Sequence, residues 1–146
     1  QIGSPAYPAD VTAWESIGTG SSSGSSFATT KVSLTAPLTY QVTVANTGSG
    51  NKYYINGVQQ ATVSLPEGGT YRFDQSAGSN SGHPFRFSIT SDGTHAGGSE
   101  YTTGVTTSGT PGNAGAYTQI VVASGAPTLY YYCSVHSGMG GQANTP

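Results

Sequence analysis

Charged residues are scarce in this chain of 146 residues. Four basic and six acidic residues make up 7% of the sequence, and the formal net charge is −2 at pH 7. A typical globular domain is about one quarter charged. The basic residues are scattered, at Lys31, Lys52, Arg72 and Arg86. Because nucleic-acid binding depends on neutralising phosphate charges with clustered lysine and arginine, we expect no nucleic-acid partner.

Cysteine and long apolar runs are also scarce. Cys133 is the one cysteine, so an internal disulfide is excluded. No apolar run approaches the ~20 residues that a membrane-spanning helix requires, and we expect no membrane insertion. The chain begins at Gln1 and has no apolar stretch typical of a signal peptide. We therefore interpret it as a processed chain or an excised piece.

The motifs of common hydrolases and nucleotide-dependent enzymes are missing. The six carboxylates show no paired spacing, and no G-x-S-x-G, H-E-x-x-H or phosphate-loop motif occurs. A nucleophilic pair of Cys133 and His136 is conceivable, but no third residue is evident that would orient the histidine. We therefore expect that the protein is not an enzyme.

The first 37 residues differ from the rest of the chain. Residues 1–8 are rich in proline, and residues 18–26 form a Gly/Ser run typical of a flexible linker. The few bulky residues in this region cannot form a core of their own. We predict an N-terminal arm over residues 1–37 that becomes ordered only by packing on its own domain or on a neighbouring subunit. Trp14 is the expected anchor, and such packing would provide a route to self-assembly.

From Tyr40 onward, apolar and polar residues alternate in short segments separated by Gly, Pro and Asn. The predicted strands cover residues 40–45, 53–55, 61–65, 70–74, 85–90, 117–123 and 128–134, with an edge strand around 101–106 and an Asn56-Gly57 turn. No apolar pattern of helical period persists for three turns. Seven or eight strands at this spacing predict an all-β fold, a Greek-key β-sandwich over residues 40–141 within a domain of residues 38–146.

Three side chains suited to soft metal ions lie within seven residues, at and after the end of the last predicted strand. They are Cys133, His136 and Met139. A thiolate, an imidazole and a thioether together favour copper, whereas zinc sites seldom use a thioether, and Mg²⁺ and Ca²⁺ prefer oxygen. His83 opens the strand of residues 85–90 and is the candidate fourth ligand. Two histidines, one cysteine and a weak axial methionine make up a blue-copper electron-transfer site.

These residues resemble the cupredoxin family, of the plastocyanin and amicyanin type. The resemblance rests on Tyr132-Cys133-x-x-His136-x-x-Met139, with His83 fifty residues before the cysteine, and it covers roughly residues 40–141. The spacing of the last three candidate ligands is similar to that of amicyanin. The resemblance implies one type 1 copper ion held by Nδ1 of both histidines, the cysteine Sγ and an axial methionine. It also implies one-electron transfer with a redox protein partner.

Two features depart from the cupredoxin pattern. The family usually has an asparagine directly after the first histidine, whose side chain and N–H brace the cysteine strand. Here Pro84 occupies that position and has no N–H, so Asn80 or Ser81 is the candidate substitute. The charged patches through which many relatives dock their partners are also missing. Tyr130 and Tyr132, expected to point outward from the cysteine strand, would serve either sheet-surface packing or docking near the metal.

A second resemblance leads to a different function. The Gly/Thr/Ser-rich composition and the segments GHPFRFS and YYYCSVHSGMGG are similar to cupredoxin-like modules in structural or tail proteins of marine bacteriophages. In that setting the domain would be a structural or adhesive module of a larger assembly, with copper incidental, structural or absent. Both interpretations favour an extracytoplasmic or virion location.

Three of the four candidate ligands also have a simpler interpretation. Cys133 would be a buried apolar residue, His83 a turn residue and Met139 a filler of a gap in the core. The remaining histidine, His95, lies in a Gly-rich segment, and we interpret it as a solvated loop residue.

Overall fold

A computed structural model of the chain describes residues 36–146. The arm predicted over residues 1–37 and its anchor Trp14 therefore lie outside the described residues, except for the last two positions of the arm. Over residues 36–146 the chain forms no α-helix, only the short 3₁₀ turns η2 (Gly78–Asn80) and η3 (Gly93–Ala96). None of the helical segments described is long and apolar enough to cross a membrane.

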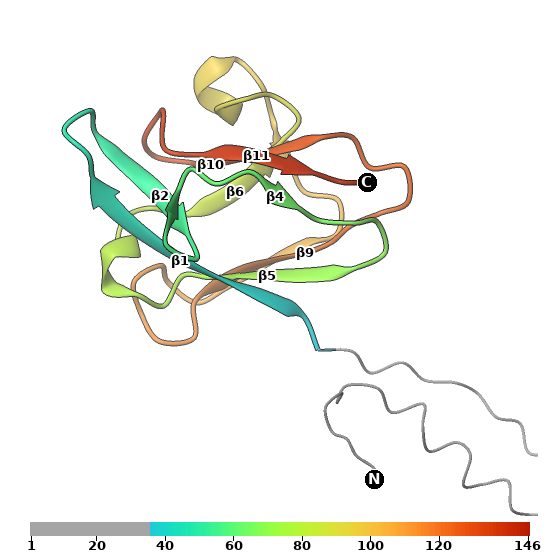
Figure 1. The fold of residues 1–146 in the computed structure, drawn as a ribbon, viewed down its shortest axis with the longest axis horizontal. Helices are drawn as coiled ribbons and strands as arrows, with labels where there is room; N and C mark the ends of the chain where they lie inside the picture. The colour runs from blue at the N-terminus through green and yellow to red at the C-terminus, as the bar shows by residue number, and fades with distance from the viewer. Residues whose placement is uncertain (1–35) are drawn as a thin grey trace, which may run out of the picture. The chain divides into compact units, whose positions relative to one another are not determined.

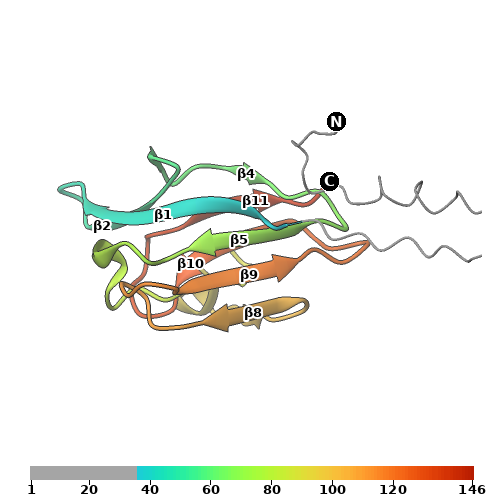
Figure 2. The ribbon, with the colours of Figure 1, turned by 90° about the horizontal axis from the view of Figure 1, so that it is seen from below.

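Within residues 36–146, eleven strands form two sheets that pack as a sandwich (Figures 1 and 2). The strands are β1 (Leu38–Asn46), β2 (Asn51–Ile55), β3 (Val58–Gln59), β4 (Val63–Ser64), β5 (Thr70–Asp74), β6 (Phe85–Ser88), β7 (Glu100–Tyr101), β8 (Val105–Ser108), β9 (Tyr117–Val121), β10 (Leu129–Cys133) and β11 (Gly141–Asn144). One sheet has the order β3-β2-β1-β5-β9-β8 and the other has the order β4-β11-β10-β6-β7. The predicted all-β sandwich is thus confirmed.

Both sheets are mixed. Strand β1 pairs in parallel with β5, and β4 pairs in parallel with β11, while the remaining pairs are antiparallel. The parallel pairs join segments that are distant in sequence, so the sheets cannot be built from hairpins alone. Figure 2 shows β1, β5, β9 and β8 side by side, with β10 behind them.

Local sequence explains several of these elements. Asn56 and Gly57 have φ angles of 50° and 85°, which a type I′ hairpin turn requires at its two central positions. The turn forms as predicted, and it joins β2 to β3, a strand that was not predicted. In β5, the side chains of Tyr71 and Phe73 are buried, whereas Arg72 and Asp74 are partly exposed. This alternation of period two is the pattern on which the strand was predicted.

The core between the sheets is largely aromatic. The ring of Phe85 lies 4.7 Å from that of Phe73, 5.0 Å from that of Tyr131 and 5.1 Å from that of Tyr53, measured between centroids. Aromatic pairs at such distances each contribute about 0.5–1.5 kcal/mol beyond the burial of their surface. Because Phe85 begins β6, the aromatic cluster rigidly supports the end of the sandwich at which the candidate ligands lie.

The structure corrects three details. The edge strand predicted around residues 101–106 is two strands in different sheets, β7 beside β6 and β8 beside β9. Strand β11 was not predicted, because Gly141–Asn144 has no alternation of large apolar residues. In the strand predicted over residues 85–90, the alternation of Phe85, Phe87 and Ile89 predicts that all three point inward, but Ile89 is 59% exposed. Strand β6 ends at Ser88, whose Oγ accepts a hydrogen bond from the N–H of Thr90, so the chain turns before Ile89 can enter the core.

Candidate metal centre

The candidate ligands meet where β6 begins and β10 ends. These neighbouring strands are antiparallel, and Phe85 lies opposite Cys133 in their register. An antiparallel pair places the start of one strand beside the end of the other. His83, two residues before Phe85, therefore comes close to Cys133 although fifty residues separate them in the chain. In Figure 1, β6 and β10 lie next to each other in the upper layer.

The thiol of Cys133 lies between two imidazoles. Its Sγ atom is 3.8 Å from Nδ1 of His83 and 3.7 Å from Nδ1 of His136. One ligand atom from each of these three residues lies within 4.8 Å of the others. Cys133 is fully buried, His83 is 8% exposed and His136 is exposed. The cluster therefore has a buried side and a surface side.

These separations fit a shared metal ion. Bonds of about 2.3 Å to sulfur and about 2.0–2.1 Å to imidazole nitrogen, as measured for zinc, place the two donor atoms about 3.6 Å apart at a tetrahedral angle and about 3.8 Å apart at a trigonal one. The observed 3.7 and 3.8 Å lie at the trigonal end of that range. The donor set consists of atoms that bind soft and borderline metals. Residues and spacing thus form a candidate metal site.

Met139, the fourth candidate ligand, lies in the loop of residues 134–140 between β10 and β11, here called the ligand loop. Its side chain is fully buried and belongs to the same apolar core as Cys133. The N–H of Tyr53 donates a 2.9 Å hydrogen bond to the Met139 carbonyl and ties this residue to β2. The loop residues between Cys133 and Met139 are exposed. The methionine is thus held in the core at both backbone and side chain.

The surroundings of His83 favour a neutral imidazole. Burial lowers the pKa of His83 below its ordinary value, and the nearby His136 lowers this pKa further. A neutral imidazole has a free lone pair on one ring nitrogen, which a metal ion requires. His83 is therefore available as a ligand near neutral pH without first losing a proton.

The backbone around His83 is held on every side. The His83 N–H donates to the Asn80 carbonyl at 2.8 Å, and the His83 carbonyl accepts from Tyr53 Oη and from Gln75 Nε2, each at 2.7 Å. Next to it, the Pro84 carbonyl accepts from the N–H of Ser134 at 3.1 Å. This last hydrogen bond joins the first ligand segment directly to the cysteine strand, using the carbonyl that proline retains.

Neither predicted substitute for the missing asparagine is seen to brace the cysteine strand, because the Asn80 side chain donates to the carbonyls of Val42 and Ala77 instead, but Asn80 does support His83. Asn80 is buried and its carbonyl accepts the His83 N–H, whereas Ser81 is exposed and its N–H donates to the Gly78 carbonyl. Gln75 was not predicted. A signal for it exists, because residues 71, 73 and 75 fall on one face of an extended chain, and a glutamine at an inward position is unusual.

The ligand loop after Cys133 is held by three side chains from separate segments. Lys52 Nζ donates to the Gly138 carbonyl at 2.8 Å, and Gln60 Nε2 donates to the Gly140 carbonyl at 2.8 Å. Asp92 Oδ1 accepts the Gly138 N–H at 2.9 Å. The loop is thus fixed by the rest of the domain rather than by its own short sequence.

Tyr132 does not point outward to solvent as expected. It is 1% exposed, because η3 covers its ring, and a Cβ atom added at Gly93 would overlap that ring. Tyr132 therefore cannot form an exposed docking face, whereas Tyr130 is partly exposed. His95 is exposed, as predicted for a loop residue, but its Nε2 lies 2.8 Å from the Cys133 carbonyl oxygen and its ring packs edge-on against Tyr132. The contact of His95 with the cysteine strand was not predicted.

The structure brings together three of the four candidate ligands, His83, Cys133 and His136, and buries the fourth, Met139, in the same core as Cys133. It adds Gln75 as a previously unrecognised neighbour of the site. No protein-family model and no curated protein matches this chain. What can be said of its chemistry therefore comes from the geometry and the donor atoms of the site.

Proposed function

We propose that this domain holds one copper ion in a type 1 site and carries single electrons. The observation that carries the proposal is the buried Cys133 thiol, whose Sγ lies 3.8 and 3.7 Å from the Nδ1 atoms of two histidines. Met139, buried in the same core, supplies the fourth donor. When bound, copper would supply a one-electron couple between Cu(I) and Cu(II).

The donor set favours copper over other ions. Structural zinc sites use four strong ligands in a tetrahedral arrangement and seldom include a thioether. Two histidines and a cysteine in a trigonal arrangement with a weak methionine are typical of electron-transfer copper. The separations from Sγ to the two nitrogens, at the trigonal end of the metal-binding range, support that choice.

The chain contributes rigidity to this function. The His83 backbone is fixed by Tyr53, Gln75 and Asn80, and the ligand loop is tied down at Gly138. Ligands held in this way move little when the charge of a bound ion changes, so little energy is needed to rearrange the site. Rigid ligands therefore suit rapid electron exchange better than they suit a reaction that needs an open coordination position.

The surface around the site favours an uncharged contact with a partner. His136 is exposed at the end of the domain, and the neighbouring Val135 is 57% exposed. The two charged side chains bonded to the ligand loop, Lys52 and Asp92, have opposite signs and both contact Gly138, so they form no patch of one sign. We propose that a redox protein partner approaches the exposed His136 through apolar and neutral polar contacts, and that the protein is not itself an enzyme.

Metal stoichiometry tests the proposed ligand set. After incubation with Cu(II) and dialysis, we expect one copper per chain in the wild type and a large loss in His83→Ala and His136→Ala. His95→Ala is the matched control, because the polar contact of this histidine is to a backbone carbonyl of the cysteine strand, and its loss should leave the stoichiometry unchanged. Met139→Leu conserves volume and should retain copper with an altered reduction potential. Equal copper loss in His83→Ala and His95→Ala would refute this ligand set.

A further inference from the structure

Gln75 is a buried polar residue next to the candidate metal centre. It directly follows β5, in the sheet opposite the one that carries His83 and Cys133, and its side chain is 1% exposed. Its own N–H donates to the Ala116 carbonyl and its carbonyl accepts from the N–H of Gly112, each at 2.8 Å. Because these two hydrogen bonds satisfy the Gln75 backbone, its side-chain amide forms hydrogen bonds with other residues.

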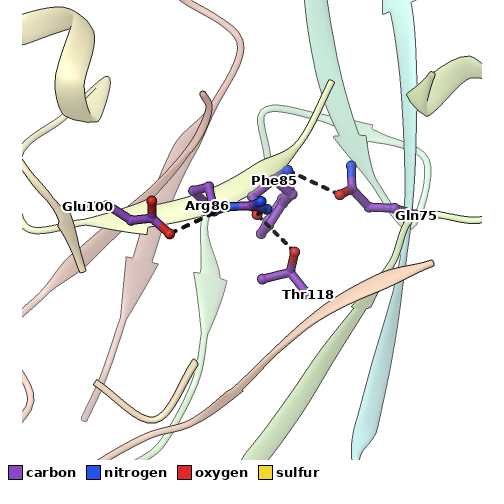
Figure 3. Close-up of polar contacts among 5 residues, drawn as sticks. All are labelled: Gln75, Phe85, Arg86, Glu100 and Thr118. Atoms are coloured by element: carbon purple, nitrogen blue, oxygen red, sulfur yellow. Dashed lines mark hydrogen bonds and ion pairs between the residues drawn. The ribbon is translucent and has the colours of Figure 1, made fainter. Parts of the chain in front are cut away.

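That amide bridges the peptides on both sides of Pro84. Gln75 Nε2 donates to the His83 carbonyl at 2.7 Å. Gln75 Oε1 accepts the N–H of Phe85 at 3.1 Å, as Figure 3 shows. The proline between them has no N–H to offer any neighbour. A single amide of fixed shape therefore sets the spacing of the carbonyl and the N–H that flank the proline.

The amide is itself held by a second buried amide. Gln75 Nε2 also donates to Asn80 Oδ1 at 3.1 Å, while Asn80 Nδ2 donates to the carbonyls of Val42 at 2.8 Å and Ala77 at 3.1 Å. Each hydrogen-bonding group of the Gln75 side chain has a partner, so it has no alternative orientation of equal energy. A fully satisfied buried network of this kind specifies one arrangement.

The far side of Phe85 is fixed as well. Thr118 Oγ1, from β9, donates to the Phe85 carbonyl at 2.8 Å, and Figure 3 shows Gln75 and Thr118 approaching this residue from different sides. Phe85 lies opposite Cys133 in the register of β6 and β10. Displacement of the Phe85 peptide would therefore change the placement of His83 relative to the cysteine.

We infer that Gln75 is a positioning residue that holds His83 in place for the metal, acting through the peptides around Pro84. The effect of Gln75 on a metal ion rests on the proposed function, whereas its hydrogen bonds around Pro84 do not depend on that proposal. Tyr53 Oη also donates to the His83 carbonyl and remains when Gln75 is replaced. The domain should therefore still fold in Gln75→Met, a variant of similar length that forms none of these hydrogen bonds.

Amide hydrogen exchange of the metal-free protein tests the contacts. In Gln75→Met we expect exchange at Phe85 to accelerate by at least about tenfold, because its N–H loses its acceptor. Exchange at Ile120, in the centre of β9, should change by less than about twofold if the effect is local. Val122→Ala is the control: Val122 is 1% exposed and follows the end of β9 opposite to Gln75, so it lowers stability without touching His83. If Gln75→Met accelerates exchange at Phe85 and at Ile120 by the same factor, as a general loss of stability in Val122→Ala would, the inference is overturned.

The Cu(II) forms of the same proteins test the positioning role. Gln75→Met should still bind copper through Cys133 but with a changed copper hyperfine splitting in electron paramagnetic resonance, whereas Val122→Ala should keep the wild-type value. Local acceleration at Phe85 with an unchanged copper spectrum would assign Gln75 a structural role only and overturn the inference. A wild-type protein that takes up no copper would defeat the proposed function, and the exchange at Phe85 would still decide whether Gln75 holds the His83 segment.

Discussion

Asp92 offers a graded test of how the ligand loop is held. Its backbone has a φ angle of 65°, in the left-handed region, and its Oδ1 accepts the N–H of Gly138 at 2.9 Å. The residue thus has two roles: it adopts a conformation that most side chains avoid, and it supports the loop between Cys133 and Met139. Replacement by asparagine, glycine and alanine separates the two roles.

The expected losses of unfolding free energy follow from these two terms. An asparagine at this position would keep an acceptor and tolerates the left-handed region, so Asp92→Asn should cost less than about 0.5 kcal/mol. Asp92→Gly tolerates the conformation but loses an exposed hydrogen bond, at a cost of about 0.5–1 kcal/mol. Asp92→Ala loses the bond and also suffers about 1 kcal/mol of backbone strain, which gives about 1.5–2 kcal/mol in total.

Urea unfolding of the metal-free variants measures this series. The midpoints should fall in the order asparagine, glycine, alanine with an unchanged dependence on urea concentration, since the surface exposed on unfolding stays the same. If Asp92→Ala is no less stable than Asp92→Gly, backbone conformation is not what the aspartate provides. If Asp92→Gly is as stable as Asp92→Asn, the hydrogen bond to Gly138 contributes nothing.

Three further predictions concern the backbone packing at Gly140, the stability of the domain at acidic pH and the oligomeric state of the chain. A Cβ at Gly140 would overlap the Tyr131 carbonyl oxygen, so Gly140→Ala should lose about 1–3 kcal/mol in urea unfolding; wild-type stability would show that the two backbones separate freely. Partial burial raises the pKa of Asp74, but hydrogen bonds from Ser76 Oγ and N–H, at 2.6 and 2.8 Å, outweigh it and leave the pKa below its usual value. A carboxyl whose pKa is lowered by folding stabilises the protein above about pH 4, and this contribution disappears as pH falls through the folded-state pKa. Between about pH 5 and about pH 2, Asp74→Asn should therefore lose less stability than the wild type, as measured by the urea midpoint at each pH. Curves of midpoint against pH that run parallel for the two proteins would contradict this. Native mass spectrometry of the full chain should give a monomer if the protein is a soluble electron carrier, whereas a stable oligomer would favour the structural or adhesive module.

The sandwich was predictable because its longer strands alternate cleanly. Strand β5 has the predicted bounds, and the Asn56-Gly57 turn forms as its sequence indicates. Strand β4 lies within the strand predicted over residues 61–65, whereas β3 and β7 have two residues each, which is too short for an alternation to be recognised. The partner of β4 is β11, about eighty residues later in the chain, and no local pattern encodes that pairing.

The candidate ligands were predictable because their residue types are rare in this chain. One cysteine, one methionine and three histidines leave few combinations, and three of the four candidates lie within seven residues. The groups that support them are ordinary polar residues, such as Gln75 and Asp92, and they come from segments remote in sequence. Burial of Tyr132 was missed for a similar reason, because the turn that covers it, at Gly93, is about forty residues away in the chain.

Visible absorption of the copper-loaded chain tests the proposed function most directly. A thiolate bound to Cu(II) gives an intense charge-transfer band, so adding Cu(II) to the metal-free protein should turn it deeply coloured, with one copper retained per chain after dialysis. Cys133→Ser replaces the buried sulfur by oxygen and should abolish the band while the domain stays folded by circular dichroism. A colourless wild-type protein that releases its copper on dialysis would contradict the assignment of His83, Cys133, His136 and Met139 as a type 1 copper site.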